Sequence, residues 1–87
     1  MKISINEIQR AFDDLICERK SREAIASWAL ELQFAEDAND LIYEPLSDEK
    51  KIWDAIGYLT GVDLLNIDGS YLHSIENFVE FKNKLDL

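Results

Sequence analysis

Residues 4–16 read SINEIQRAFDDLI, and this stretch decides the class of the fold. Ser4 and Glu7 have the spacing of a capping box, in which a serine hydroxyl and a glutamate carboxylate each accept a backbone N–H at the start of a helix. Apolar residues then recur at helical spacing on one side: Ile5, Ile8, Ala11, Phe12, Leu15 and Ile16. The stretch therefore predicts an amphipathic helix from about Ile5 to Glu18.

Three further segments combine a capping residue with an apolar stripe. The predicted caps are Ser21, Ser47 and Ser74, and the first two of these helices are expected to end near Glu36 and Gly61. Asp68-Gly69 lies between two apolar runs, which favours a tight turn or a short hairpin. The prediction is an all-α fold, a compact bundle of about four helices, with any strand confined to the neighbourhood of Asp68-Gly69.

Two features complicate the bundle. Pro45 disfavours helical geometry at Glu44, so residues 38–46 are expected to form an irregular or extended connector. Ala26, Leu30 and Phe34 form an apolar row on the side of their helix opposite to Trp28. Another element is expected to cover this row.

Length and composition fit one domain spanning residues 1–87, with a hydrophobic content of 47% to build its core. No stretch approaches the roughly 18 consecutive apolar residues that a membrane-spanning helix needs. The single Cys17 permits no intramolecular disulfide, and the first residues lack the pattern of a secretory signal. The sequence therefore predicts a cytoplasmic protein that does not insert into membranes.

Charge is high and uneven. Eighteen acidic residues face nine basic ones, and a net charge of −9 would repel phosphate backbones, so no direct binding of nucleic acid is expected. No basic residue lies between Arg22 and Lys50, a stretch that holds eight acidic residues. This stretch is either a solubilising surface or a patch for a basic protein partner.

The residues for catalysis are sparse. His73 is the only histidine, so any site that pairs a serine or cysteine nucleophile with an imidazole base must use it. His73 and Glu76 could offer a metal two ligands at most, and no glycine motif for phosphate binding is present. We therefore expect no catalytic residue, no metal site and no cofactor, and we interpret the protein as one that is not an enzyme.

Recognition is the remaining activity, and aromatic residues beside acids are frequent interface anchors. The predicted partner-binding residues are Glu31, Phe34, Glu36, Asp37, Asp40, Tyr43, Glu44, Asp48, Trp53 and Asp54. Two of them have alternative structural roles, because Trp53 lies near the edge of an apolar stripe and Tyr43 could seal the connector.

Three phrases carry a resemblance to a known group: residues 21–28 (SREAIASW), 52–64 (IWDAIGYLTGVDL) and 71–74 (YLHS). They resemble the small helical immunity proteins of bacterial toxin systems, including contact-dependent growth inhibition and polymorphic toxins, over roughly residues 21–85. Residues 40–45 (DLIYEP) also look like a short run in the colicin nuclease immunity proteins, with Glu44 in place of a second tyrosine. From that group, the resemblance implies a partner-binding role only for Tyr43 and its acidic neighbours.

The resemblance implies a protein that neutralises a cognate toxin domain, expected to be a basic nuclease, by forming a tight protein–protein complex. Negative charge would then steer the two proteins together. The alternative is a non-catalytic regulatory or structural interaction module, including a homodimer that buries Leu30, Phe34 and Trp53 against a second copy.

Overall fold

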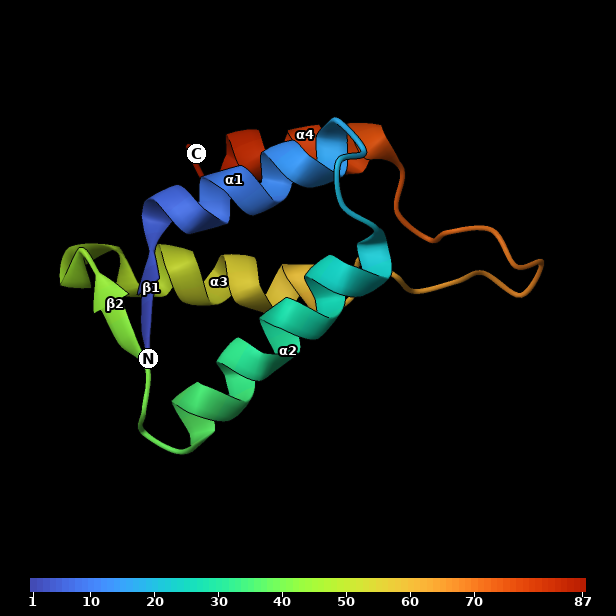
Figure 1. Ribbon diagram of the computed structural model, residues 1–87. Helices are drawn as coiled ribbons and strands as arrows, with labels where there is room; N and C mark the ends of the chain where they lie inside the picture. Colours follow the sequence, from blue (N-terminus) through green and yellow to red (C-terminus); the bar gives the residue numbers. More distant parts are fainter.

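The capping box predicted at Ser4 is formed and starts the first helix. The Glu7 amide donates to Ser4 Oγ at 3.1 Å, and the Ser4 amide donates to Glu7 Oε1 at 3.3 Å. The computed structural model describes residues 1–87 (Figure 1). Its elements are β1 (Lys2–Ser4), α1 (Ile5–Ile16), α2 (Arg22–Asp37), β2 (Ile42–Glu44), the short 3₁₀ helix η1 (Leu46–Asp48), α3 (Glu49–Leu59) and α4 (Ile75–Lys84).

Two of the three other predicted caps are also confirmed. Ser21 Oγ accepts the Ala24 amide at 3.1 Å, and Ser74 Oγ accepts the Asn77 amide at 3.2 Å. The predicted cap at Ser47 is wrong, because η1 precedes α3 and the residue at its N-cap makes no side-chain cap hydrogen bond. A tight 3₁₀ turn after Pro45 thus replaces the usual capping side chain.

Three of the helices end in the same way. The residue after each C-cap, namely Glu18, Asn39 or Asp86, has a φ between 56° and 59°. After α1, the Arg19 amide bonds the Asp14 carbonyl at 2.8 Å and the Glu18 amide bonds the Leu15 carbonyl at 3.3 Å. This is the Schellman pattern, which normally uses glycine. It ends α1 at Ile16, two residues before the predicted end.

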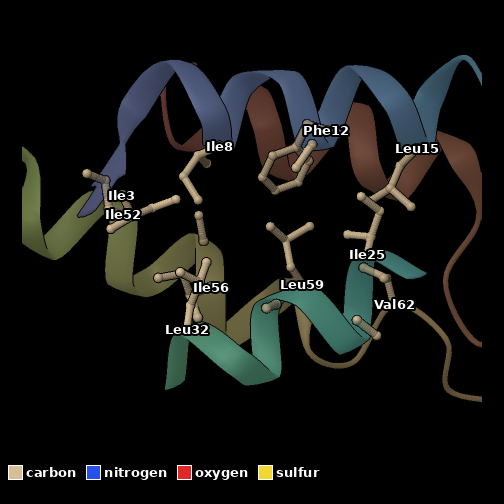
Figure 2. Close-up of a cluster of buried hydrophobic side chains, with 14 of the residues drawn as sticks. Ile3, Ile8, Phe12, Leu15, Ile25, Leu32, Ile52, Ile56, Leu59 and Val62 are labelled. Carbon is tan, nitrogen blue, oxygen red and sulfur yellow. The ribbon is translucent and has the colours of Figure 1, made fainter. Parts of the chain in front are cut away.

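The helices form two layers. In Figure 1, α1 and α4 lie side by side above α2 and α3. Figure 2 shows the core between the layers, where side chains from both meet. The buried residues labelled there are Ile3, Ile8, Phe12, Leu15, Ile25, Leu32, Ile52, Ile56, Leu59 and Val62. Phe78 joins them from α4. None of the helices combines the length and apolar composition needed to cross a membrane.

The fold is mostly helical but not all-α, because β1 and β2 form a two-stranded parallel sheet in which Ile3 pairs with Tyr43. The prediction of no strand outside the Asp68-Gly69 region is therefore wrong. Ile3 is fully buried and Tyr43 is 6% exposed, so the sheet closes one end of the core. Each strand has three residues, too few to show the alternation that identifies a strand in a sequence.

The predicted turn is present at the opposite end. Leu65 and Tyr71 form an isolated antiparallel bridge, the Asn66 amide bonds the Ser70 carbonyl at 2.7 Å, and Gly69 has a φ of 88°. The loop therefore has three residues, with glycine at its left-handed position. We call residues 64–72 the hairpin arm, which Figure 1 shows extending away from the helices.

Candidate functional site

Four of the five basic residues of the N-terminal half lie along α1, the turn after it and the start of α2. Arg10, Arg19, Lys20 and Arg22, which we call the basic edge, face only three acidic residues in the span 10–22: Asp13, Asp14 and Glu18. Asp13 is already bound to Lys82 from α4 at 2.9 Å. The span from Arg10 to Arg22 thus has an excess of positive charge in a strongly acidic chain.

Asp14 organises the turn. It is 7% exposed, and its Oδ1 accepts Arg19 Nε at 2.8 Å while its Oδ2 lies 3.6 Å from Lys20 Nζ. The hydrogen bond from Arg19 is the main reason why the pKa of Asp14 is lowered. The side chains of Arg19 and Lys20 remain 56% and 59% exposed. A buried carboxylate therefore orients two cations that still reach solvent.

Arg22 has a different role. Its guanidinium donates through Nη1 to the His73 carbonyl and lies 4.1 Å from the ring centroid of Tyr71 and 4.8 Å from that of Phe78. These contacts are cation–π interactions. Arg22 is half-buried and fixes the root of the hairpin arm to the first turn of α2.

A second contact fixes the same root. The Tyr71 hydroxyl donates to Glu23 Oε1 at 2.7 Å. This hydrogen bond holds the pKa of Glu23 below its ordinary value and raises that of Tyr71. The basic edge and the hairpin arm therefore form one connected surface.

Two hollows lie along the basic edge. The first, about 330 Å³, lies between α1 and α2, and its lining includes Arg10, Lys20 and Trp28. The second, about 320 Å³, is lined by Arg19, Lys20, Arg22 and Tyr71 among others. Lys20 borders both hollows, so the four cations lie around adjoining depressions and not on separate faces. Glu7 and Asp14 also line the first hollow, and Glu18 and Glu23 line the second, so the cations of the basic edge lie among an equal number of acids.

The predicted partner residues lie mainly at the other end of the molecule, around the C-terminal end of α2, β2 and the start of α3 (Figure 1). Phe34 is 62% and Trp53 37% exposed, while Glu31 and Asp37 are exposed and form no ion pair. Another element was expected to cover the apolar row of Ala26, Leu30 and Phe34 on α2. Only Ala26 is buried, whereas Leu30 is 42% exposed, so most of the row is not covered.

Several of the acids predicted to bind a partner have cationic neighbours. Glu44 lies 3.3 Å from Lys2, Asp54 lies 3.2 Å from Lys50, and Asp40 lies 3.7 Å from the N-terminal amine. Asp48 is half-buried in η1. Local ion pairing thus reduces the charge of this end below the value that counting residues gives.

Glu36, Tyr43 and Trp53 line one small hollow of about 250 Å³. The Tyr43 hydroxyl donates to Glu36 Oε2 at 2.7 Å, and burial together with this bond raises the pKa of Tyr43. Tyr43 therefore seals the connector, the alternative role considered above. Whether the acidic end binds any partner stays a prediction.

The residues considered for catalysis are not assembled. The His73 ring packs 5.3 Å from that of Tyr58, and Cys17 is exposed at the C-cap of α1. No group of three His, Cys, Asp or Glu side chains could hold a metal ion. His73 directly precedes α4, and its neighbour Ser74 forms the N-cap of that helix.

The basic edge was missed by sequence reasoning, although a signal for it was present. Charge was averaged over the whole chain, and the basic-free stretch after Arg22 was used to define an acidic patch. The same boundary follows five of the nine basic residues, and four of these five form the basic edge. Only the packing of α1 against α2 brings Arg10 to the hollow shared with Lys20.

Comparison with known proteins gives one match. The family model described as YxzC DNA-binding protein matches residues 3–84. No curated protein and no solved structure matches significantly. This match contradicts the interpretation as an immunity protein of a bacterial toxin system, with its toxin partner, and it contradicts the exclusion of a nucleic-acid partner.

The reason for the error lies in the phrases that carried the resemblance. Ser21 and Ser74 cap helices, and Ile52 lies in the core, so these phrases describe a helical fold and not a toxin interface. The net charge was equally misleading, because it does not describe a local surface. Since the family model covers nearly the whole sequence, the chain belongs to the YxzC DNA-binding protein family.

Proposed function

We propose that the protein binds DNA through the basic edge, by contacts of Arg10, Arg19, Lys20 and Arg22 with the phosphate backbone. The observation that carries the proposal is the gathering of these four cations around two adjoining hollows. The description of the family supports it. Phosphate contacts of this kind supply affinity that does not depend on base sequence.

The high negative charge limits how DNA can approach. Of the eight acidic residues between Arg22 and Lys50, Glu23 lines the second hollow, and the other seven lie farther along α2 and on the elements after it, which extend away from the basic edge (Figure 1). Repulsion by this end orients the duplex toward the α1–α2 turn. We therefore expect a small contact with one orientation and not a wrapped complex.

The remaining aspects of the function are proposals of the same kind. We infer that the protein acts by binding and not by catalysis, because the His73 ring packs against Tyr58 while Cys17 is exposed at the C-cap of α1. We also infer that residues 1–87 work as one domain, since one core cluster draws on all four helices. A DNA ligand fits a cytoplasmic location.

The salt dependence of binding tests the proposal. Four phosphate contacts predict a slope of about −3.6 for log K against log salt, or a loss of roughly 100-fold between 50 and 200 mM. Fluorescence anisotropy with a labelled random-sequence duplex measures this slope. The Arg19→Ala, Lys20→Ala double variant should reduce the slope by about 2.

The matched control is Lys50→Ala, Lys51→Ala, which removes equal charge at the start of α3 and should leave the slope unchanged. The Arg19→Ala, Lys20→Ala double variant also removes both cationic partners of Asp14, which loosens the turn between α1 and α2. Arg10→Ala avoids this problem because Arg10 is exposed and forms no ion pair, and it should reduce the slope by about 1. Absence of binding at low salt, or equal slopes for all variants, contradicts the proposal.

A further inference from the structure

The hairpin arm concentrates exposed apolar surface. Twelve large hydrophobic residues of the chain are exposed, and five of them fall within the nine residues of the arm: Leu64, Leu65, Ile67, Tyr71 and Leu72. Ile67 is fully exposed at the tip and contacts no core residue. Asp68 is the only charged residue of the arm. So much apolar surface on one projecting loop indicates a binding element.

The arm is held in a defined position. Within it, the Leu72 amide bonds the Leu64 carbonyl at 2.8 Å, and the Asn66 amide bonds the Ser70 carbonyl at 2.7 Å. At its root, Tyr71 is bonded to Glu23 and Arg22 lies over the Tyr71 ring. The apolar tip is therefore presented by an ordered hairpin and does not depend on a loop that must fold first.

The root of the arm identifies the kind of partner. Tyr71 lines the same hollow as three cations, Arg19, Lys20 and Arg22, which outnumber its two acids, Glu18 and Glu23, so positive charge lies beside the base of an apolar projection. Proteins that bend DNA combine these two features, because cations bind the phosphates while an apolar side chain enters a base step from the minor groove.

A second copy of the chain fits less well. In a two-fold dimer through the arms, each residue near the axis faces the same surface of the other copy. The two sets of Arg19 and Lys20 would then approach each other with like charge. The charges beside the arm thus favour an anionic partner over self-association.

We propose that the hairpin arm is a DNA-bending wedge, whose Ile67 inserts between base pairs in the minor groove while the basic edge holds the flanking phosphates. This inference rests on the proposed function. Asp68 does not prevent the approach, because its carboxylate is turned back onto the loop. Its Oδ1 accepts Ser70 Oγ at 2.6 Å and the Ser70 amide at 3.0 Å.

The test measures binding and bending separately with the full chain. The probe is a short A·T-rich duplex with a donor dye at one end and an acceptor at the other. Anisotropy reports binding, and energy transfer reports the bend, which is expected to be roughly 20–90°. Ile67→Ser should abolish most of the increase in energy transfer and weaken binding about tenfold, in line with the loss of one buried aliphatic side chain.

Two further variants make the test specific. Leu46→Ser removes an aliphatic side chain that is 70% exposed in η1, outside the arm, and it should change neither signal. Asp68→Asn keeps an acceptor oxygen for Ser70 but removes the negative charge, so it should raise the affinity. The circular dichroism spectrum of Ile67→Ser should match that of the wild type, because Ile67 lies outside the core and its replacement should not unfold the protein.

The outcomes separate the two proposals. A wild-type protein that binds the duplex without bending it, or that bends it equally after Ile67→Ser, shows that the wedge is wrong while DNA binding stands. A protein that binds no duplex at low salt overturns both. A wild-type dimer that Ile67→Ser converts into a monomer in sedimentation experiments identifies the arm as a contact between copies and refutes the wedge.

Discussion

At the scale of single residues, Glu18 shows how a helix end can carry strain. Its φ of 58° places a side chain in the left-handed region, which glycine occupies without steric conflict. We predict that Glu18→Gly raises the free energy of unfolding by about 0.5–1 kcal/mol relative to Glu18→Ala, because only glycine removes the Cβ conflict. Urea titration of both variants measures the difference. Equal stabilities would contradict the assigned strain.

Tyr43 should give the protein a stability that depends on alkaline pH. Burial and the bond to Glu36 raise its pKa above the ordinary 10.0, so the folded state holds the phenolic proton more tightly than the unfolded state. This contribution is complete below pH 10 and is lost as the pH rises through the folded pKa. Tyr43→Phe should cost about 1 kcal/mol at neutral pH by removing the hydrogen bond to Glu36.

The prediction is tested by comparing the stability of Tyr43→Phe with that of the wild type at alkaline pH. Stability measured by urea titration should fall less steeply above pH 10 in the variant than in the wild type. Part of the fall will remain, because the pKa values of Tyr58 and Tyr71 are raised as well. Identical pH profiles would show that Tyr43 is not the buried, bonded group described above.

At the scale of elements, the short parallel sheet closes one end of the core and should contribute to the stability of that end. Ile3 is fully buried in β1, opposite Tyr43 of β2. We predict that Ile3→Ala lowers the free energy of unfolding by about 2–5 kcal/mol, as expected for a buried aliphatic side chain. Ile42→Ala is the matched control, because Ile42 lies in the same sheet but is 55% exposed. Ile42→Ala should lower the free energy of unfolding by only about 0.5 kcal/mol.

At the scale of the whole molecule, the distance between the acidic end and the basic edge should limit the effect of the acidic residues on DNA affinity. Asp37 ends α2, and 15 residues of helix place it about 22 Å from Arg22. This separation exceeds the Debye length of about 8 Å at 0.15 M salt but not that of about 30 Å at 0.01 M. Asp37→Lys should therefore leave DNA affinity nearly unchanged at the higher salt and raise it at the lower.

Anisotropy titrations at the two salt concentrations decide this prediction, with Arg10→Ala as the comparison at the basic edge. Arg10→Ala should weaken binding at both concentrations. A large effect of Asp37→Lys at 0.15 M salt would show that the acidic end lies close to the bound duplex, and the orientation proposed above would then be wrong.

The sequence by itself determined the helices and most of their caps. Ser4, Ser21 and Ser74 act locally, since each bonds an amide three residues ahead, and the apolar stripes follow from helical spacing alone. These interactions need no information from distant parts of the chain. The helical character and the turn near Asp68-Gly69 could therefore be predicted.

Tertiary structure alone decided the sheet and the candidate site. Ile3 pairs with Tyr43 across 40 positions, and three-residue strands have no periodic signal of their own. Likewise Arg10 joins Lys20 only because α1 packs against α2, and the Arg22 contact with His73 spans 51 positions. The net charge predicted a protein that repels phosphate backbones, and only the fold shows which charges share a surface, because a surface collects residues by spatial proximity and not by their order in the sequence.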